Sequence, residues 1–424
     1  MENKRYKLGV IDLYSVAKNE TEIESTPVFF VTLRDMVDKE KLSAALRKAL
    51  TYYPLFATTL EYKGEYALVS QDGELPIIES SFEDRLKYFG KETGGYLYRF
   101  CIWEREIAFE WSRILTDEFG ARDFLLAVLY AYFGESIKEP DDKAVDIFLE
   151  VLTEKSAGAA VSRGATSDET PKEKEKKDYS QVKNPHTPTR KNPNEATLYT
   201  ISVNMNELRA SSSRDDASCG SVIIPIFSNV LHRRAGDGDV SVTADVIFDC
   251  RKPGLDSMHN FTVSKILAYS NIFSKTDVKR LMEVYEKMLS SAKDGVKDEA
   301  ERTINAVKPL VNLRPRFLAD FASLVVSKAV KRERSNFAFL NLGKIELTER
   351  VGRGIERIKI CAIPDSADTG ISVLEHSDKL IMTITENYVD EKIISDFVSI
   401  SKMLGINFKI EKSEAFTQSR LKLK

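Results

Sequence analysis

The sequence predicts an α/β protein built of two lobes. Three observations lead to this prediction: short apolar or alternating segments typical of strands occur in both halves, amphipathic segments typical of helices lie between them, and a highly charged stretch separates the halves. The 424 residues suffice for two domains or one large two-lobed unit. We therefore expect an N-terminal lobe over 1–153, a flexible charged linker over 154–195 and a C-terminal lobe over 196–424.

The composition excludes several classes of protein. A net charge of −3 gives no support for a nucleic-acid-binding surface. No apolar run approaches membrane-spanning length, so no membrane span is expected. The four cysteines, Cys101, Cys219, Cys250 and Cys361, are far apart and form no C-x-x-C pair. We expect free thiols in a reducing cytoplasm and no metal site.

The N-terminal lobe has a regular order of elements. A continuous apolar strand over 27–33 is followed by a helix that begins after Asp38 and is closed by Pro54. Further on, a strand over 96–103 is expected to pair with the strand Ile107–Trp111 across a tight turn.

A connection between a strand and a helix then follows. Ile107–Trp111 is apolar and aromatic, and helical spacing of apolar residues resumes at Phe119 and ends at Gly134. Ser112–Glu118 is therefore a loop held between two rigid elements, a common place for functional residues.

The C-terminal lobe also alternates strands and helices. The segments expected are strands over 198–203, 240–248 and 336–345, helices over 222–230, 274–289 and 316–330, a hairpin over 370–385, a helix over 393–404 and a last strand over 406–410. His186, His232 and His376 lie in polar surroundings and are expected to face solvent.

The loop resembles a known motif. A strand, His-His-x-x-x-Asp-Gly and an amphipathic helix are typical of CoA-dependent acyltransferases, which include chloramphenicol acetyltransferase, condensation domains and alcohol O-acetyltransferases. The chain looks most like the last group, whose loop reads His-Ala-Leu-Thr-Asp-Gly where this chain has Arg113-Ile114-Leu115-Thr116-Asp117-Glu118. The resemblance implies a pseudo-symmetric, chloramphenicol-acetyltransferase-like sandwich with mixed sheets and a channel between the lobes. It also implies acyl-CoA and a small alcohol as ligands.

The residues that carry chemistry in that family are altered. The second His is the general base, and it is replaced by Arg113; Ser112 replaces the first His and Glu118 the Gly. A guanidinium group stays protonated to above about pH 12, so Arg113 cannot act as a base. Arg113 and Glu118 could form an ion pair that plugs the channel, whereas an ordinary loop would pair Arg113 with Asp117.

Other residues gain a role from the same resemblance. In that family, an Arg that follows a strand forms a salt bridge with the Asp of the motif. The resemblance therefore implies a structural ion pair between Arg251 and Asp117. The alternative is that Arg251 is only a turn residue. Asn260, Asn341 and Gly343 match residues that line the family's channel. His259 is a candidate substitute base.

Three hypotheses about function follow. The first is an impaired relative that acts by binding CoA, a lipid or a protein partner. The second is an active O-acyltransferase that uses His259 or Glu118 as its base. The third is an interaction protein whose charged segment recruits partners.

Overall fold

The computed structural model describes residues 4–8, 12, 15–16, 26–63, 66–80, 88–90, 93–138, 195–211, 218–235, 241–251, 260–295, 335–362, 367–386, 390–417 and 420–422. The predicted linker over 154–195 lies outside this part of the chain except for its last residue, and the helix expected over 316–330 lies outside it entirely.

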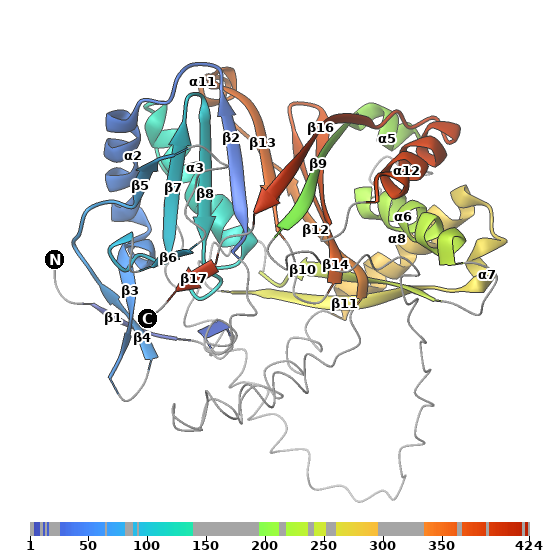
Figure 1. The fold of residues 1–424 in the computed structure, drawn as a ribbon, viewed down its shortest axis with the longest axis horizontal. Coiled ribbons are helices and arrows are strands. Elements are labelled where there is room, and N and C mark those ends of the chain that lie inside the picture. The colour runs from blue at the N-terminus through green and yellow to red at the C-terminus, as the bar shows by residue number, and fades with distance from the viewer. Residues whose placement is uncertain are drawn as a thin grey trace, which may run out of the picture.

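The first half of the chain forms most of one lobe (Figure 1). Its elements are β1 (Arg5–Lys7), β2 (Val28–Leu33), α2 (Lys39–Tyr52), the 3-10 helix η1 (Pro54–Ala57), β3 (Thr58–Tyr62), β4 (Tyr66–Ser70), β5 (Ile77–Glu79), β6 (Tyr88–Gly90), β7 (Tyr98–Trp103), β8 (Glu106–Trp111) and α3 (Glu118–Tyr132). The expected hairpin is present, because β7 and β8 pair antiparallel from Tyr98 opposite Trp111 to Trp103 opposite Glu106.

The second half forms the other lobe and returns to the first. Its elements are β9 (Glu195–Asn204), α5 (Met205–Ser211), α6 (Cys219–Ala235), β10 (Val242–Asp249), β11 (Thr262–Tyr269), α7 (Asn271–Ser274), α8 (Val278–Asp294), β12 (Ser335–Lys344), α11 (Glu349–Gly354), β13 (Ile355–Cys361), β14 (Ala367–His376), β15 (Lys379–Glu386), α12 (Glu391–Met403), β16 (Lys409–Thr417) and β17 (Arg420–Lys422).

Two large mixed sheets form the framework, as predicted. The five-stranded sheet has the order β13-β2-β8-β7-β5, and the seven-stranded sheet has the order β11-β10-β12-β14-β15-β9-β16. The first contains one parallel pair, β5 with β7, and the second contains two, β10 with β12 and β12 with β14. Smaller sheets join β1, β4 and β3, and β17 with β6.

One strand from the second half of the chain joins the first lobe's sheet. Strand β13 pairs antiparallel with β2. Its residues Ile358 and Ile360 are buried in the core of that lobe. The pairing supplies β2 with a second neighbour and buries apolar side chains, so the two halves of the chain share this sheet.

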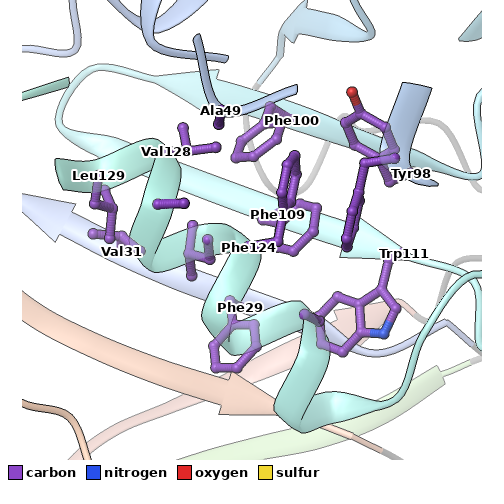
Figure 2. Packing of buried hydrophobic residues seen from close by; sticks show 14 of the residues in the cluster. Phe29, Val31, Ala49, Tyr98, Phe100, Phe109, Trp111, Phe124, Val128 and Leu129 are labelled. Carbon is purple, nitrogen blue, oxygen red and sulfur yellow. The ribbon is translucent and has the colours of Figure 1, made fainter. Parts of the chain in front are cut away.

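Helices cover one face of each large sheet. Figure 2 shows α3 lying on the aromatic face of the first sheet, where the ring centroid of Phe109 is 4.7 Å from that of Phe100 and 5.3 Å from that of Trp111. Helices α6, α8 and α12 supply buried residues to the core of the second sheet. The opposite face of the first sheet packs on β9 through Val28, Phe30 and Leu198. The order of layers is therefore helix, sheet, sheet, helix.

Candidate functional site

The loop Ser112–Glu118, which we call the motif loop, is fixed at both ends by hydrogen bonds that its own residues make. At its start, the Ser112 amide donates to the Leu97 carbonyl at 2.8 Å, and the Ser112 hydroxyl accepts from the Ile114 amide at 3.1 Å. At its end, Asp117 is the N-cap of α3, and its Oδ1 accepts from the Phe119 and Gly120 amides at 3.0 Å each. The loop is buried rather than a solvated turn, and Ser112 and Asp117 have structural contacts.

Asp117 also connects the two lobes. Its Oδ1 accepts from Nη2 of Arg251 at 2.8 Å, and its Oδ2 accepts from the Phe261 amide at 2.7 Å. The structure thus brings Asp117 and Arg251 together. Oδ1 of Asp117 accepts three hydrogen bonds and Oδ2 accepts one, so the carboxylate holds the loop in place.

Arg251 is held by two carboxylates. Its Nη1 donates to Oδ1 of Asp249 at 2.8 Å, on the side opposite to the contact with Asp117. Burial of Arg251 opposes its charge, but Asp117 and Asp249 outweigh this effect and raise the pKa of Arg251. The guanidinium group is therefore a permanent cation that joins the end of β10 to the start of α3.

Arg113 and Glu118 form the second ion pair of the loop. Nε and Nη2 of Arg113 donate to the same oxygen of Glu118, Oε1, at 3.0 and 2.6 Å. The Arg113 side chain is 19% exposed and that of Glu118 is 3% exposed. The pair of opposite charges is therefore nearly electrically neutral.

Asn260 supports the loop from the second lobe. Its Nδ2 donates to the carbonyl of Arg113 at 2.5 Å and to Oδ1 of Asp12 at 2.7 Å. Asp12 is buried and was not identified from the sequence, because an isolated acidic residue near the N-terminus gives no local signal. His259, the candidate substitute base, lies outside the described residues.

Asn341 and Gly343 lie at the end of β12. Oδ1 of Asn341 accepts from the Gly343 amide at 2.9 Å, and Gly343 has a φ of 70°, which favours glycine. Between them, the Leu342 carbonyl accepts from Nη1 of Arg122 in α3 at 3.0 Å. Arg122 thus connects α3 to the end of β12. The resemblance associates this end of β12 with the family's channel.

Other titratable groups near the loop are unsuited to catalysis. Burial raises the pKa of the Cys250 thiol to about 12, and the charges of Asp249 and Asp117 add to the rise. A thiol with such a pKa is not a nucleophile at neutral pH. Among the described residues, no group of three or more His, Cys, Asp and Glu side chains could hold a metal ion. No helix of the described ranges is both long and apolar enough to cross a membrane.

Two histidines differ from the sequence-based expectation. His232 and His376 were expected to face solvent, but both are buried. His232 packs inside the C-terminal lobe, with Nε2 2.6 Å from Oδ1 of Asn271. Burial lowers the pKa of His376. Their exposure depends on neighbours that are distant in sequence, which local polarity does not reveal.

A fully buried ion pair was also missed. Arg99 in β7 donates through Nε to Oε2 of Glu110 in β8 at 2.5 Å, and both side chains are fully buried. The two residues are directly opposite in the hairpin register. The register of the predicted hairpin, together with the opposite charges, could have identified this pair.

Comparisons with known proteins give the fold. No protein-family model matches the sequence, and no curated protein sequence matches it either. Solved structures do match over nearly the whole chain. Polyketide synthase associated protein 5 from Mycobacterium tuberculosis is 15% identical, with a TM-score of 0.59 over 94% of this chain and 97% of that one.

Two further structures connect the fold with CoA chemistry. Trichothecene 15-O-acetyltransferase from Fusarium sporotrichioides is 13% identical, with a TM-score of 0.54 over 95% of each chain. A starter condensation domain of rhizomide synthetase, solved in complex with C8-CoA, is 12% identical, with a TM-score of 0.56 over 95% of each chain. At such identities the similarity establishes the architecture and leaves the activity to the residues of the site.

Proposed function

This chain has the fold of CoA-dependent acyltransferases and condensation domains, and we propose that it binds a CoA thioester and transfers its acyl group slowly or not at all. One observation supports the proposal: Arg113, which stands where the resemblance places the general base, donates to Glu118 through its guanidinium. Loss of a general base typically reduces the rate by roughly a hundred- to ten-thousandfold. Binding does not depend on that base.

The structural half of the motif supports binding. Asp117 retains its contacts with α3, with Arg251 and with the Phe261 amide, so the loop is held between the lobes. None of these contacts involves Arg113, so the loop is held without the side chain that replaces the base. The natural ligand of the proposed site is acyl-CoA or a small alcohol, and a protein ligand would use the same scaffold.

Titration calorimetry with CoA and acetyl-CoA tests the proposal, with adenosine monophosphate as the control. Binding of CoA and acetyl-CoA, with little binding of the nucleotide alone, is expected for a site that recognises the pantetheine arm. If neither CoA nor acetyl-CoA bound, the proposal would be contradicted.

A second candidate function is O-acyl transfer with Glu118 as the base. The observation that favours it is the place of Glu118 in the loop, where its side chain is 3% exposed and its Oε1 accepts from Arg113. A neighbouring cation makes a carboxylate less basic, which weakens this candidate. If the wild type transfers acyl groups, loss of transfer in Glu118→Gln with unchanged CoA binding would identify Glu118 as the base. His259 is examined in the same way, by His259→Gln.

We place the protein in the cytoplasm. Cys101, Cys219, Cys250 and Cys361 are free thiols, as is common where glutathione keeps proteins reduced.

A further inference from the structure

Two consecutive residues of the second lobe hold the motif loop near both of its ends. Nδ2 of Asn260 donates to the carbonyl of Arg113 at 2.5 Å, and the amide of Phe261 donates to Oδ2 of Asp117 at 2.7 Å. Both residues are buried directly before β11, and the carbonyl of Phe261 accepts from the amide of Cys250 at 2.8 Å. The same two residues therefore fix the loop at Arg113 and at Asp117.

Asn260 is in turn held by Asp12. Oδ1 of Asp12 accepts from the same Nδ2 atom at 2.7 Å. An amide nitrogen carries two hydrogens, so one points to Asp12 and the other to the carbonyl of Arg113. Both partners are acceptors, so the amide oxygen could not take the place of the nitrogen. The orientation of the Asn260 side chain is therefore determined by its two contacts.

Asp12 reaches this position from the first lobe. In the sequence it lies between β1, which pairs with β4, and Val16, which is buried in the core of that lobe. The Asp12 side chain is itself buried, with 2% of it exposed. The hydrogen bond between Asp12 and Asn260 therefore joins the two lobes beside the motif loop, in addition to the ion pair of Asp117 with Arg251.

We propose that Asp12 is a positioning residue of the candidate site and sets the backbone at Arg113 through Asn260. A carboxylate acceptor makes a stronger hydrogen bond than a neutral oxygen, and it polarises the amide so that the second N–H bond is strengthened as well. The inference rests on the proposed function for its assignment of the site to this loop. The contact between Asp12 and Asn260 involves no ligand.

A role of Asp12 in overall stability alone is the alternative. If Asp12 only stabilised the fold, its removal would promote unfolding of the whole chain. If it positions the loop, its removal lets the loop open while the rest of the fold stays closed. The two roles therefore differ in which backbone amides exchange their hydrogens faster with solvent.

Hydrogen exchange of the segment 112–118, measured without ligand, tests the proposal. In Asp12→Ala this segment is expected to exchange roughly five to thirty times faster, whereas β10 and β15 keep their wild-type rates. Asp12→Asn retains an oxygen that can accept from Asn260, so its rate should lie closer to that of the wild type. Unchanged exchange of the loop in Asp12→Ala, or equal acceleration in all three segments, would overturn the proposal.

Asn260→Ala tests whether Asp12 acts through Asn260. In this background the added substitution Asp12→Ala should not accelerate the loop further, because the connection is already lost. A further acceleration would overturn the proposal. The matched control is Asp277→Ala, which removes the acidic N-cap of α8 in the second lobe and should leave the exchange of the loop unchanged. Acceleration in this control would show that the loop responds to any such loss, which also overturns the proposal.

Calorimetry with CoA on the same variants separates this inference from the proposed function. If the wild type binds CoA, Asp12→Ala should bind it more weakly, by at most the factor measured for the loop, and Asp12→Asn should bind it nearly as well as the wild type. Equal affinities of the wild type and Asp12→Ala would overturn the positioning role. If the wild type does not bind CoA, the proposed function fails, and the exchange of the loop still decides whether Asp12 holds it through Asn260.

Discussion

Arg251 and Asp117 form a buried ion pair, 2.8 Å from Nη2 to Oδ1, that joins strand β10 of one lobe to the motif loop of the other. Asp117 simultaneously caps helix α3 and accepts a hydrogen bond from the Phe261 amide. The carboxylate is thus the point at which the loop, the helix and the second lobe meet. Removal of this carboxylate should lower the free energy of unfolding far more than removal of an ordinary N-cap does.

Asp117→Ala is expected to reduce the free energy of unfolding by about 3–5 kcal/mol, because it leaves buried donors and part of the Arg251 charge unpaired. Urea denaturation measures this change. The control is Asp38→Ala, which removes the more exposed N-cap of α2 and should cost about 1 kcal/mol. Equal losses in the two variants would show that Asp117 is only a cap.

The Arg113–Glu118 pair should show strong coupling. In Arg113→Ala the nearly buried Glu118 loses both donors to Oε1, whereas in the double variant with Glu118→Ala no charge is left behind. The double-mutant cycle is expected to give a coupling energy of about 0.5–3 kcal/mol. Additive losses would mean that the two side chains do not interact in solution.

Lys359 forms an ion pair that connects the five-stranded sheet to the seven-stranded sheet. Nζ of Lys359 in β13 is 2.8 Å from Oε1 of Glu414 in β16, and both side chains are largely buried. Lys359→Met should lower the free energy of unfolding by about 1–3 kcal/mol at neutral pH. Lys344→Met, which removes an exposed pair with Glu346, should change it by less than about 0.5 kcal/mol.

The loss in Lys359→Met should also depend on pH. Burial opposes ionisation of Glu414, but Lys359 and Lys412 lower its pKa below the ordinary value of 4.5. A lowered pKa contributes stability above the unfolded pKa, and this contribution disappears as the pH falls through the folded value. The difference between wild type and variant should therefore shrink in acid. A difference that is constant from pH 7 to pH 3 would exclude the ion pair as its cause.

Glu386 should make the protein less stable as the pH rises. Burial raises its pKa from 4.5 to about 8, and a hydrogen bond from the Asp390 backbone and the charge of Arg234 oppose this rise only in part. Between these two values the folded state holds a proton that the unfolded state has released, so stability falls with increasing pH by at most about 1.4 kcal/mol per unit.

Thermal unfolding of Glu386→Gln at pH 6 and pH 9 measures this effect. The amide resembles the neutral acid, so the drop in Tm between the two pH values should be smaller than in the wild type. Glu391→Gln, an exposed position in α12, should keep the wild-type drop. An unchanged drop in Glu386→Gln would show that this carboxyl is not the proton-binding group.

The sequence predicted those features that depend on local patterns. The hairpin of β7 and β8 follows from apolar alternation, and helix α3 with its cap at Asp117 follows from helical spacing. The resemblance to acyltransferases supplied the contact between Arg251 and Asp117, which no local pattern contains. It also supplied the layered architecture, which the structural comparisons confirm.

The features that were missed depend on distant parts of the chain. β13 joins the first sheet because it pairs with the backbone groups along the edge of β2. The sequence of residues 355–361 does not indicate which strand will be its partner. The sequence left two pairings open for Arg113, and the structure has the one with Glu118, because Asp117 is already engaged by backbone amides and Arg251. The burial of His232 likewise results from α7 and β11 packing over it.

Release of free thiol from acetyl-CoA, followed with a panel of small alcohols, measures acyl transfer at the loop directly. Because the Arg113 guanidinium cannot accept a proton at neutral pH, the wild type should release thiol no faster than the Arg113→Ala variant or protein-free solution. Alcohol-dependent release by the wild type that persists in Arg113→Ala would contradict this expectation and show that another base drives the reaction.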